Sequence, residues 1–193
     1  MSVSIDEDEC GPLGSCLWRR GQKGDATCFI SYLDEATNQF RAVNASAHFL
    51  LALKSDDKVL DIGCGTGDDA RELAALVAPN GLAIGIDKSK SMIAEARIAE
   101  ARRRAQGCSL PVRFEVGEAE HLPWESDYFD ACRADRVLQH LAGPDQALNE
   151  MVRVLRPGGH VLAVDRDWGM VALDSVDPVT TRVVLDRACA GHP

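Results

Sequence analysis

The sequence predicts an α/β fold in which a parallel sheet is covered by helices on both faces. Short apolar stretches alternate with segments whose apolar residues recur at three- and four-residue steps, which is typical of strands that alternate with helices. The stretch 82–86 is apolar throughout, as expected for a strand covered on both sides. The strand predicted at 58–62 runs directly into glycines at alternate positions, and a helical pattern follows.

The elements follow one another in a simple order. An amphipathic helical pattern occupies 31–53, broken into two, and the helix after the glycine turn ends at Pro79-Asn80-Gly81. The other predicted elements are the helix 68–77, the strand 82–86, the helix 91–106, the strands 112–116 and 129–133, a loop and helical turn at 134–141, the helix 144–154, a turn at 155–159, the strand 160–164 and the helix 178–190.

The length of 193 residues favours one domain with a sizeable core. We place this domain at 29–193. Residues 1–28 mix acids, glycines and cysteines without a helical or strand period, and we interpret them as an N-terminal arm. A mobile arm and an ordered tail both remain open.

The glycine turn is built for close approach of a ligand, because a side chain there would hold the backbone away from whatever binds. Gly63, Gly65 and Gly67 give a Gly-x-Gly-x-Gly pattern. A dinucleotide fingerprint would need its third glycine at position 68, which is Asp68. An acid beside a helix N-terminus would also repel a pyrophosphate. Both departures count against a dinucleotide ligand.

The run Val59-Leu60-Asp61-Ile62-Gly63-Cys64-Gly65-Thr66-Gly67, with Asp87 at the end of the next strand, resembles the first motifs of the class I S-adenosylmethionine-dependent methyltransferases. Gly117-Glu118-Ala119 and the Leu155-Arg156-Pro157-Gly158-Gly159 turn support the resemblance, which extends over about 32–167. It implies a Rossmann-like, doubly wound, three-layer α/β/α fold and S-adenosylmethionine as cofactor. Such sheets usually close with two further strands that we do not find after residue 170, so we expect a missing C-terminal piece.

The resemblance also assigns the cofactor contacts. Asp87 would accept both ribose hydroxyls, although it could instead cap the following helix. Glu118 and the amide of the next residue would read the adenine; Glu stands where the family has Asp, so its reach is longer, and a solvated loop acid is the alternative. The expected cofactor-binding residues are Asp61, Gly63, Cys64, Gly65, Asp87, Lys88, Met92, Glu118, Ala119 and Arg133.

A side-chain base is optional, because the methyl group of a sulfonium is already activated and the protein supplies mainly position. If the acceptor must lose a proton, His140 is our candidate, against the alternative of a packed or capping histidine. Asp135 and Asp167 are expected to orient substrate or to pair with Arg136 or Arg166. The arginines of the helix 91–106 are expected to complement the helix dipole. Trp18, Phe29 and Tyr32 could belong to a lid.

The net charge of −9 and a pI near 5.0 argue against nucleic acid or an anionic membrane as a partner. No apolar run approaches the ~20 residues of a membrane span, so we expect a cytoplasmic protein. The seven cysteines show no metal-ligand spacing and are interpreted as reduced thiols, with no metal site. Some related methyltransferases act on arsenite through thiolates, an alternative that the scattered cysteines disfavour.

The sequence therefore predicts an enzyme that methylates a small, neutral or cationic molecule, such as a quinone precursor or a secondary metabolite. A cofactor-binding module without turnover, acting as a partner or regulatory subunit, is the alternative. A nicotinamide oxidoreductase is a weaker third hypothesis. The sequence leaves a homo-oligomer open.

Overall fold

The computed structural model describes residues 46–165, 179, 182 and 183. The predicted arm 1–28, most of the helix 31–53, Arg166 and Asp167 lie outside the described residues, as does most of the helix 178–190. The described elements are β1 (Lys58–Ile62), α2 (Asp68–Val77), β2 (Leu82–Asp87), α3 (Lys90–Ala105), β3 (Val112–Val116), β4 (Phe129–Asp135), the 3-10 turn η1 (Leu138–His140), α4 (Pro144–Val154) and β5 (Leu155–Val164).

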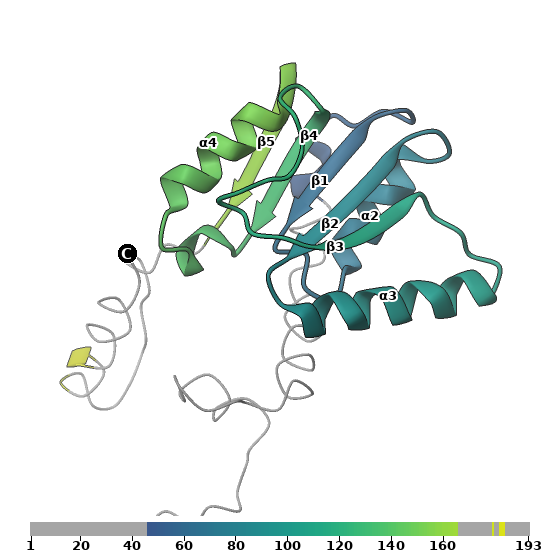
Figure 1. The fold of residues 1–193 in the computed structure, drawn as a ribbon, viewed down its shortest axis with the longest axis horizontal. Coiled ribbons are helices and arrows are strands. Elements are labelled where there is room, and N and C mark those ends of the chain that lie inside the picture. Colours follow the sequence, from purple (N-terminus) through teal and green to yellow (C-terminus); the bar gives the residue numbers. More distant parts are fainter. Residues whose placement is uncertain (1–45, 166–178, 180–181, 184–193) are drawn as a thin grey trace, which may run out of the picture. The chain divides into compact units, whose positions relative to one another are not determined.

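The five strands form one parallel sheet in the order β3-β2-β1-β4-β5 (Figure 1). The chain starts at the centre with β1, moves outward through β2 and β3, and then crosses to the other side of β1 to add β4 and β5. The order therefore reverses between β1 and β4. Ligands of doubly wound sheets bind at the carboxyl ends of the strands beside such a reversal.

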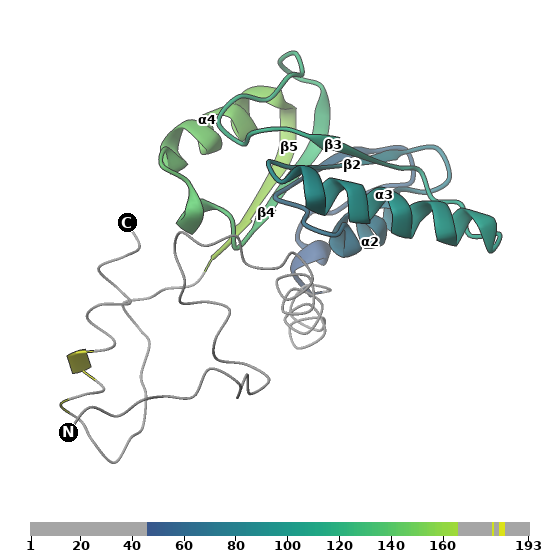
Figure 2. The ribbon, with the colours of Figure 1, turned by 60° about the horizontal axis from the view of Figure 1, so that its bottom comes forward.

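Helices cover both faces of the sheet, as predicted (Figure 2). Apolar residues of α2 and α3 pack with Val59 and Ala131 on one face, whereas those of α4 pack with Leu60 and Cys132 on the other. Neighbouring strand residues point to opposite faces, so each strand serves both layers. The three-layer, Rossmann-like α/β/α architecture is confirmed.

Most predicted boundaries agree with the structure; the bounds of β1, α2, β3 and α4 match as given. The prediction for β4 was wrong at its end, because the strand continues through Asp135 and does not stop at Arg133. Ala134 and Asp135 stay in the sheet because they pair with Ala163 and Val164 of β5. The helix α3 begins one residue earlier than predicted, after Ser89, whose side chain caps the helix by accepting from the N–H of Met92.

The predicted turn at 155–159 is instead part of β5. Leu155 already pairs with Phe129, and His160 pairs with Ala131, so four residues of β5 stand opposite a single residue of β4. The extra residues form a bulge, with Gly158 at φ +83°. A side chain at Gly159 would come within 2.8 Å of the carbonyl oxygen of Asp130. Gly158 and Gly159 thus permit a bulge within β5, and not a turn that precedes the strand.

Among the described residues, no helix is both long enough and apolar enough to cross a membrane.

Candidate cofactor site

The glycine turn between β1 and α2 is close-packed on its inner side. Gly63 and Gly67 have φ values of +67° and +84°. A side chain at Gly63 would collide with Val137, and one at Gly67 would collide with the ring of Phe114. The N–H of Cys64 donates to the carbonyl of Ile86 at 2.9 Å, which ties the turn to β2. Glycine is needed at both positions by backbone angle and by packing.

Asp87, the last residue of β2, holds the turn from the other side. One carboxylate oxygen accepts the N–H of Gly65 at 3.1 Å, and the second accepts the N–H of Ser89 at 2.8 Å. Each oxygen has a further lone pair. Ser89, not Asp87, is the N-cap of α3. Asp87 therefore lies where the sequence predicted a ribose-binding acid and also fixes the backbone of Gly65.

A buried arginine joins three elements beside the turn. The guanidinium of Arg133 donates to Asp61 at 2.9 Å, to Asp69 at 3.0 Å and to Asp135 at 3.1 Å. Arg133 and Asp61 are only 2% and 1% exposed, so water screens this contact little. Asp135 also pairs with Arg136 at 3.3 Å, which confirms the expected pair. β1, α2 and β4 thus share one ionic cluster.

This cluster holds more carboxylates than Arg133 can neutralise. Burial raises the pKa of Asp61, Arg133 opposes this shift, and the neighbouring Asp69 and Asp135 reinforce it; the net result is a pKa of about 7. One oxygen of Asp61 and the Nε of Arg133 are buried without a hydrogen-bond partner. A cationic group that reached Asp61 would therefore be stabilised.

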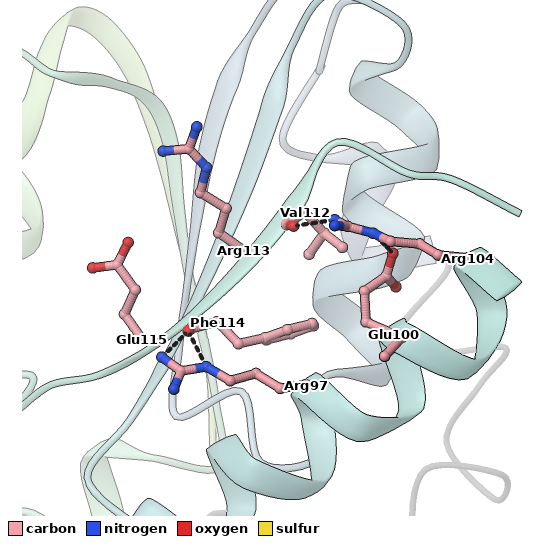
Figure 3. A pocket seen from close by; sticks show the side chains of 8 residues that line it. Arg97, Glu100, Arg104, Val112, Arg113, Phe114 and Glu115 are labelled. Carbon is pink, nitrogen blue, oxygen red and sulfur yellow. Dashed lines mark hydrogen bonds and ion pairs between the residues drawn. The ribbon is translucent and has the colours of Figure 1, made fainter.

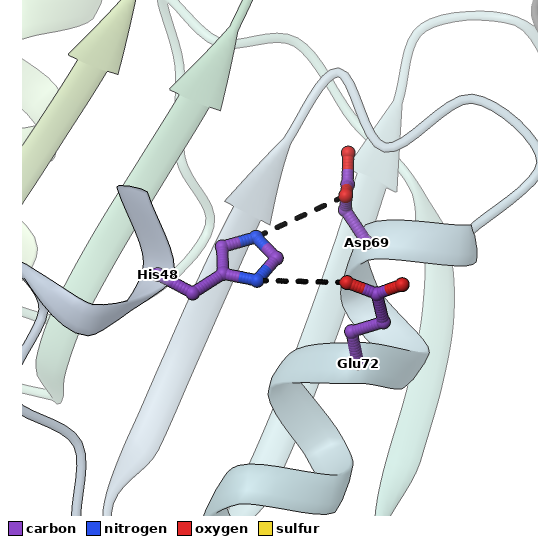
Figure 4. Close-up of side chains that lie close together, drawn as sticks. All are labelled: His48, Asp69 and Glu72. Carbon is purple, nitrogen blue, oxygen red and sulfur yellow. Dashed lines mark ion pairs between the residues drawn. The ribbon is translucent and has the colours of Figure 1, made fainter. Parts of the chain in front are cut away.

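His48 lies beside the same cluster (Figure 4). Its Nε2 is 3.8 Å from Asp69 and its Nδ1 is 3.7 Å from Glu72. Each ring nitrogen faces a different carboxylate, so the imidazole ring lies between Asp69 and Glu72. Burial, followed by the nearby charge of Arg133, lowers the pKa of His48. The neutral ring joins the residues before β1 to α2.

The remaining predicted cofactor residues lie at the carboxyl ends of β2 and β3. Lys88 is exposed, and Met92 is buried in the first turn of α3. Glu118 follows β3 with 72% of its side chain exposed, whereas Ala119 is buried in the core on the α4 face. The structure brings the ends of β1, β2 and β3 together, with Glu118 free to extend outward.

His140 is exposed at the end of η1. The preceding residue, Gln139, donates its N–H to Asp165 at the end of β5 at 3.2 Å, which fixes the turn against the sheet. The catalytic role of His140 stays a prediction.

The described cysteines do not favour a thiolate site. Cys64, Cys108 and Cys132 are free thiols. Burial raises the pKa of Cys132 to about 12 and that of Cys64 above its ordinary value. The thiols of Cys64 and Cys132 are therefore protonated at neutral pH.

A hollow of about 470 Å³ lies elsewhere, between α3 and β3 (Figure 3). Arg97 donates from two nitrogens to the carbonyl of Phe114, and Arg104 donates to that of Val112. The helix dipole, which we predicted as the reason for these arginines, is thus only part of their role. None of the lining residues belongs to the glycine turn or to the loop after β3.

Sequence reasoning named Asp61, Arg133 and Asp135 separately but missed Asp69, His48 and the ionic cluster that these residues form. A signal was present: Arg133 and Asp135 are charged residues two apart, and therefore on one face, in a strand that is largely buried. Their partners His48 and Asp69 belong to segments far away in sequence, which no local pattern indicates.

Residues 53–188, more than half of the chain, match the family model described as "Methyltransferase domain".

The chain also resembles individual proteins. It is 41% identical over 165 residues to an uncharacterized 37.1 kDa protein in a transposon of Streptomyces fradiae, a match that covers 82% of this chain and 46% of that protein. It is 34% identical to the ubiquinone/menaquinone biosynthesis C-methyltransferase UbiE of Pseudomonas paraeruginosa, over 60% of this chain and 44% of UbiE. The chain thus spans less than half the length of these relatives.

Among solved structures, the [4+2]-cyclase SpnF is similar, with a TM-score of 0.55 and 32% identity. The match covers 62% of this chain and 43% of SpnF.

Proposed function

Because the chain belongs to the class I S-adenosylmethionine-dependent methyltransferase family, we propose that it transfers a methyl group from S-adenosylmethionine to a small-molecule acceptor. The observation that carries the proposal is the turn at Gly65, whose N–H is held at 3.1 Å by the carboxylate of Asp87. It lies beside the point where the strand order reverses, which is the ligand edge of such sheets.

The residues present fit this cofactor. Asp87 offers acceptor lone pairs to ribose hydroxyls, and the side-chain-free Gly65 allows close approach of the main chain. Asp61 has an unpartnered buried oxygen in a cluster with excess negative charge, which suits the ammonium and sulfonium of the methionine end. Glu118 and the Ala119 amide would take the adenine, while Gly63, Cys64, Lys88 and Met92 would line the rest of the site.

When bound, the cofactor supplies a methyl group on positively charged sulfur, ready for in-line displacement. The chain's own residues hold the two reactants in line, which can contribute on the order of 7–11 kcal/mol. Arg133 fixes Asp61 from behind, and η1 presents His140 near the ends of β4 and β5. We propose that His140 takes the acceptor's proton where the acceptor has one to lose.

The acceptor class is supported by the similarity to UbiE, whose name gives quinone biosynthesis and a carbon acceptor. The net charge of −9 also disfavours a polyanionic acceptor such as nucleic acid. A reduced quinone precursor with an unsubstituted ring carbon is the acceptor to test first. Its methylated product can be followed by mass spectrometry.

The cofactor site is tested by calorimetric titration with S-adenosylhomocysteine, the demethylated product. We expect Asp87→Ala to weaken binding about 100-fold, since it removes charge-assisted hydrogen bonds. Gly65→Val should abolish binding. The matched control is Asp130→Asn at the amino end of β4, where the carboxylate accepts the N–H of Lys58 at 2.6 Å; its affinity should not change. Equal affinity in all variants would mean that the cofactor lies elsewhere.

The similarity to SpnF supports a second candidate, a cofactor-binding protein without methyl transfer, because SpnF is named as a cyclase. This candidate predicts tight binding of S-adenosylmethionine but no S-adenosylhomocysteine released with any acceptor. Release of S-adenosylhomocysteine that depends on an added small molecule would reject it.

A further inference from the structure

The loop between β3 and β4 is attached to α4 at alternate residues. The side-chain amide of Gln146 donates to the carbonyl of Glu120 at 3.0 Å. Glu150 accepts the N–H of Leu122 at 2.8 Å. Arg153 donates to the carbonyls of Leu122 at 3.0 Å and Trp124 at 2.8 Å. Gln146, Glu150 and Arg153, which we name the α4 clamp, thus contact the main chain at residues 120, 122 and 124.

Two residues of the α4 clamp also contact each other. Its members are four and three residues apart, so they lie on one side of α4. Glu150 and Arg153 form a two-pronged ion pair, with contacts of 2.6 and 2.8 Å. Arg153 still has N–H donors for the two loop carbonyls, and Glu150 still has a lone pair for the loop amide. Side chains that are locked in pairs set the position of the backbone they bind.

Apolar contacts anchor the same loop independently. Ala119 and Leu122 are each 6% exposed and pack in one cluster with Ala147 and Met151 of α4. These contacts keep the loop on the sheet without the α4 clamp. Because the apolar contacts already hold the loop on the sheet, we interpret the α4 clamp as fixing the position of the loop's main chain.

Glu118 stands immediately before the clamped residues. Its side chain is 72% exposed, and within residues 46–165 it makes one loose contact, with His121 at 4.0 Å. This contact is too long to fix the side chain of Glu118, so the position of the Glu118 backbone decides where its carboxylate can reach. The same holds for the amide of Ala119.

We propose that Gln146, Glu150 and Arg153 are positioning residues for recognition of the adenine base, because they fix the main chain that carries Glu118 and Ala119. The inference rests on the proposed function, in which these two residues contact the base. The α4 clamp touches neither cofactor nor acceptor; it acts through the loop.

The test compares two ligands, S-adenosylhomocysteine and its inosine counterpart, in which an oxygen replaces the exocyclic amino group. Wild type should prefer the adenine ligand, since Glu118 accepts from that amino group. Arg153→Leu should lose about tenfold in affinity for the adenine ligand and less than twofold for the inosine ligand, so the preference falls. Glu150→Gln keeps an acceptor for the N–H of Leu122 and should give an intermediate loss.

Arg156→Leu is the matched control, because Arg156 pairs with Asp130 at the opposite end of the sheet. It should leave both affinities unchanged, and thermal unfolding of each variant is recorded alongside. An unchanged preference in Arg153→Leu and Glu150→Gln, or an equal loss for both ligands, would overturn the inference. No binding of either ligand to wild type would instead reject the proposed function.

Discussion

The two faces of the sheet are built from the same strands but follow different physical rules. Toward α4, β1 and β4 present Leu60, Ile62, Cys132 and Ala134, which are all apolar and buried. Toward α2, at the carboxyl ends, the same strands present Asp61, Arg133 and Asp135. One face contributes stability through burial of apolar area. The other carries charges out of water, which costs free energy unless every charge is paired.

The difference indicates what each face is for. A buried ionic cluster is weak evidence for stability, since well-packed apolar residues often do as well. Here the cluster lies at the ligand edge and has more carboxylates than arginine. We interpret the charged face as the part of the core that serves ligand binding. The α4 face is the part that stabilises the fold.

The largest expected effect is on the charged face. Arg133→Met removes the shared partner of three carboxylates, and the free energy of unfolding at pH 8 should fall by about 3–5 kcal/mol. Urea denaturation measures it. At pH 5 the loss should be smaller, because Asp61 can then take up a proton. A loss below about 1 kcal/mol at pH 8, as expected for an exposed pair, would contradict a buried cluster.

The apolar face should respond through packing alone. Met151 is fully buried on α4, and Met151→Ala should reduce the free energy of unfolding by about 2–4 kcal/mol through lost contacts and a cavity. Urea denaturation at pH 5 and pH 8 should give the same loss at both values. A loss that depends on pH would show that the two faces are coupled.

Asp61 should make stability depend on pH. Its pKa is raised to about 7 in the folded state, so between the unfolded pKa near 4 and pH 7 the folded chain holds one more proton than the unfolded chain. Its contribution is fully present below pH 4 and is lost as the pH rises toward 7, by at most about 1.4 kcal/mol per unit. Asp61→Asn should flatten this slope in urea denaturation measured from pH 4 to 7. An unchanged slope would assign the proton to another group.

A substitution outside both packed faces should have the smallest effect on stability. Gly158 lies in the bulge of β5 at φ +83°, and an added methyl group would meet nothing within 4 Å. Gly158→Ala should therefore cost only the backbone strain of about 1 kcal/mol. A thermal melt measures it, and a cost above about 3 kcal/mol would mean that the bulge packs more tightly than described.

The fold could be predicted because its signals are local. Apolar runs for β1 and β3, and amphipathic segments for α2 and α4, each with glycine or proline nearby, gave bounds that match the structure. The error at Ala134 and Asp135 arose because strand pairing with β5, and not local propensity, decides where β4 ends. The bulge at Gly158 was taken as a turn for the same reason: its sequence suits either, and only the register with β4 distinguishes them.

The site was predictable only in part. The position of Asp87 beside the glycine turn could be predicted, because a strand end after an apolar run can be read from the sequence, and its carboxylate does accept the N–H of Gly65; its contact with a ribose stays a prediction. The environment of Arg133 was not, because Asp61, Asp69 and Asp135 meet it from three elements and a sequence gives no distances between them. The α4 clamp was missed likewise, since its residues look like an ordinary polar side of a helix.

The arginines on α3 have a consequence for how the molecule meets its neighbours. In the described sheet, β3 is an outermost strand, and such a strand can recruit a strand from another molecule into an aggregate. Arg97 and Arg104 occupy the carbonyls of Phe114 and Val112, which an incoming strand would need as acceptors. They also place two positive charges there, so fibre-like growth from this border of the described sheet is disfavoured.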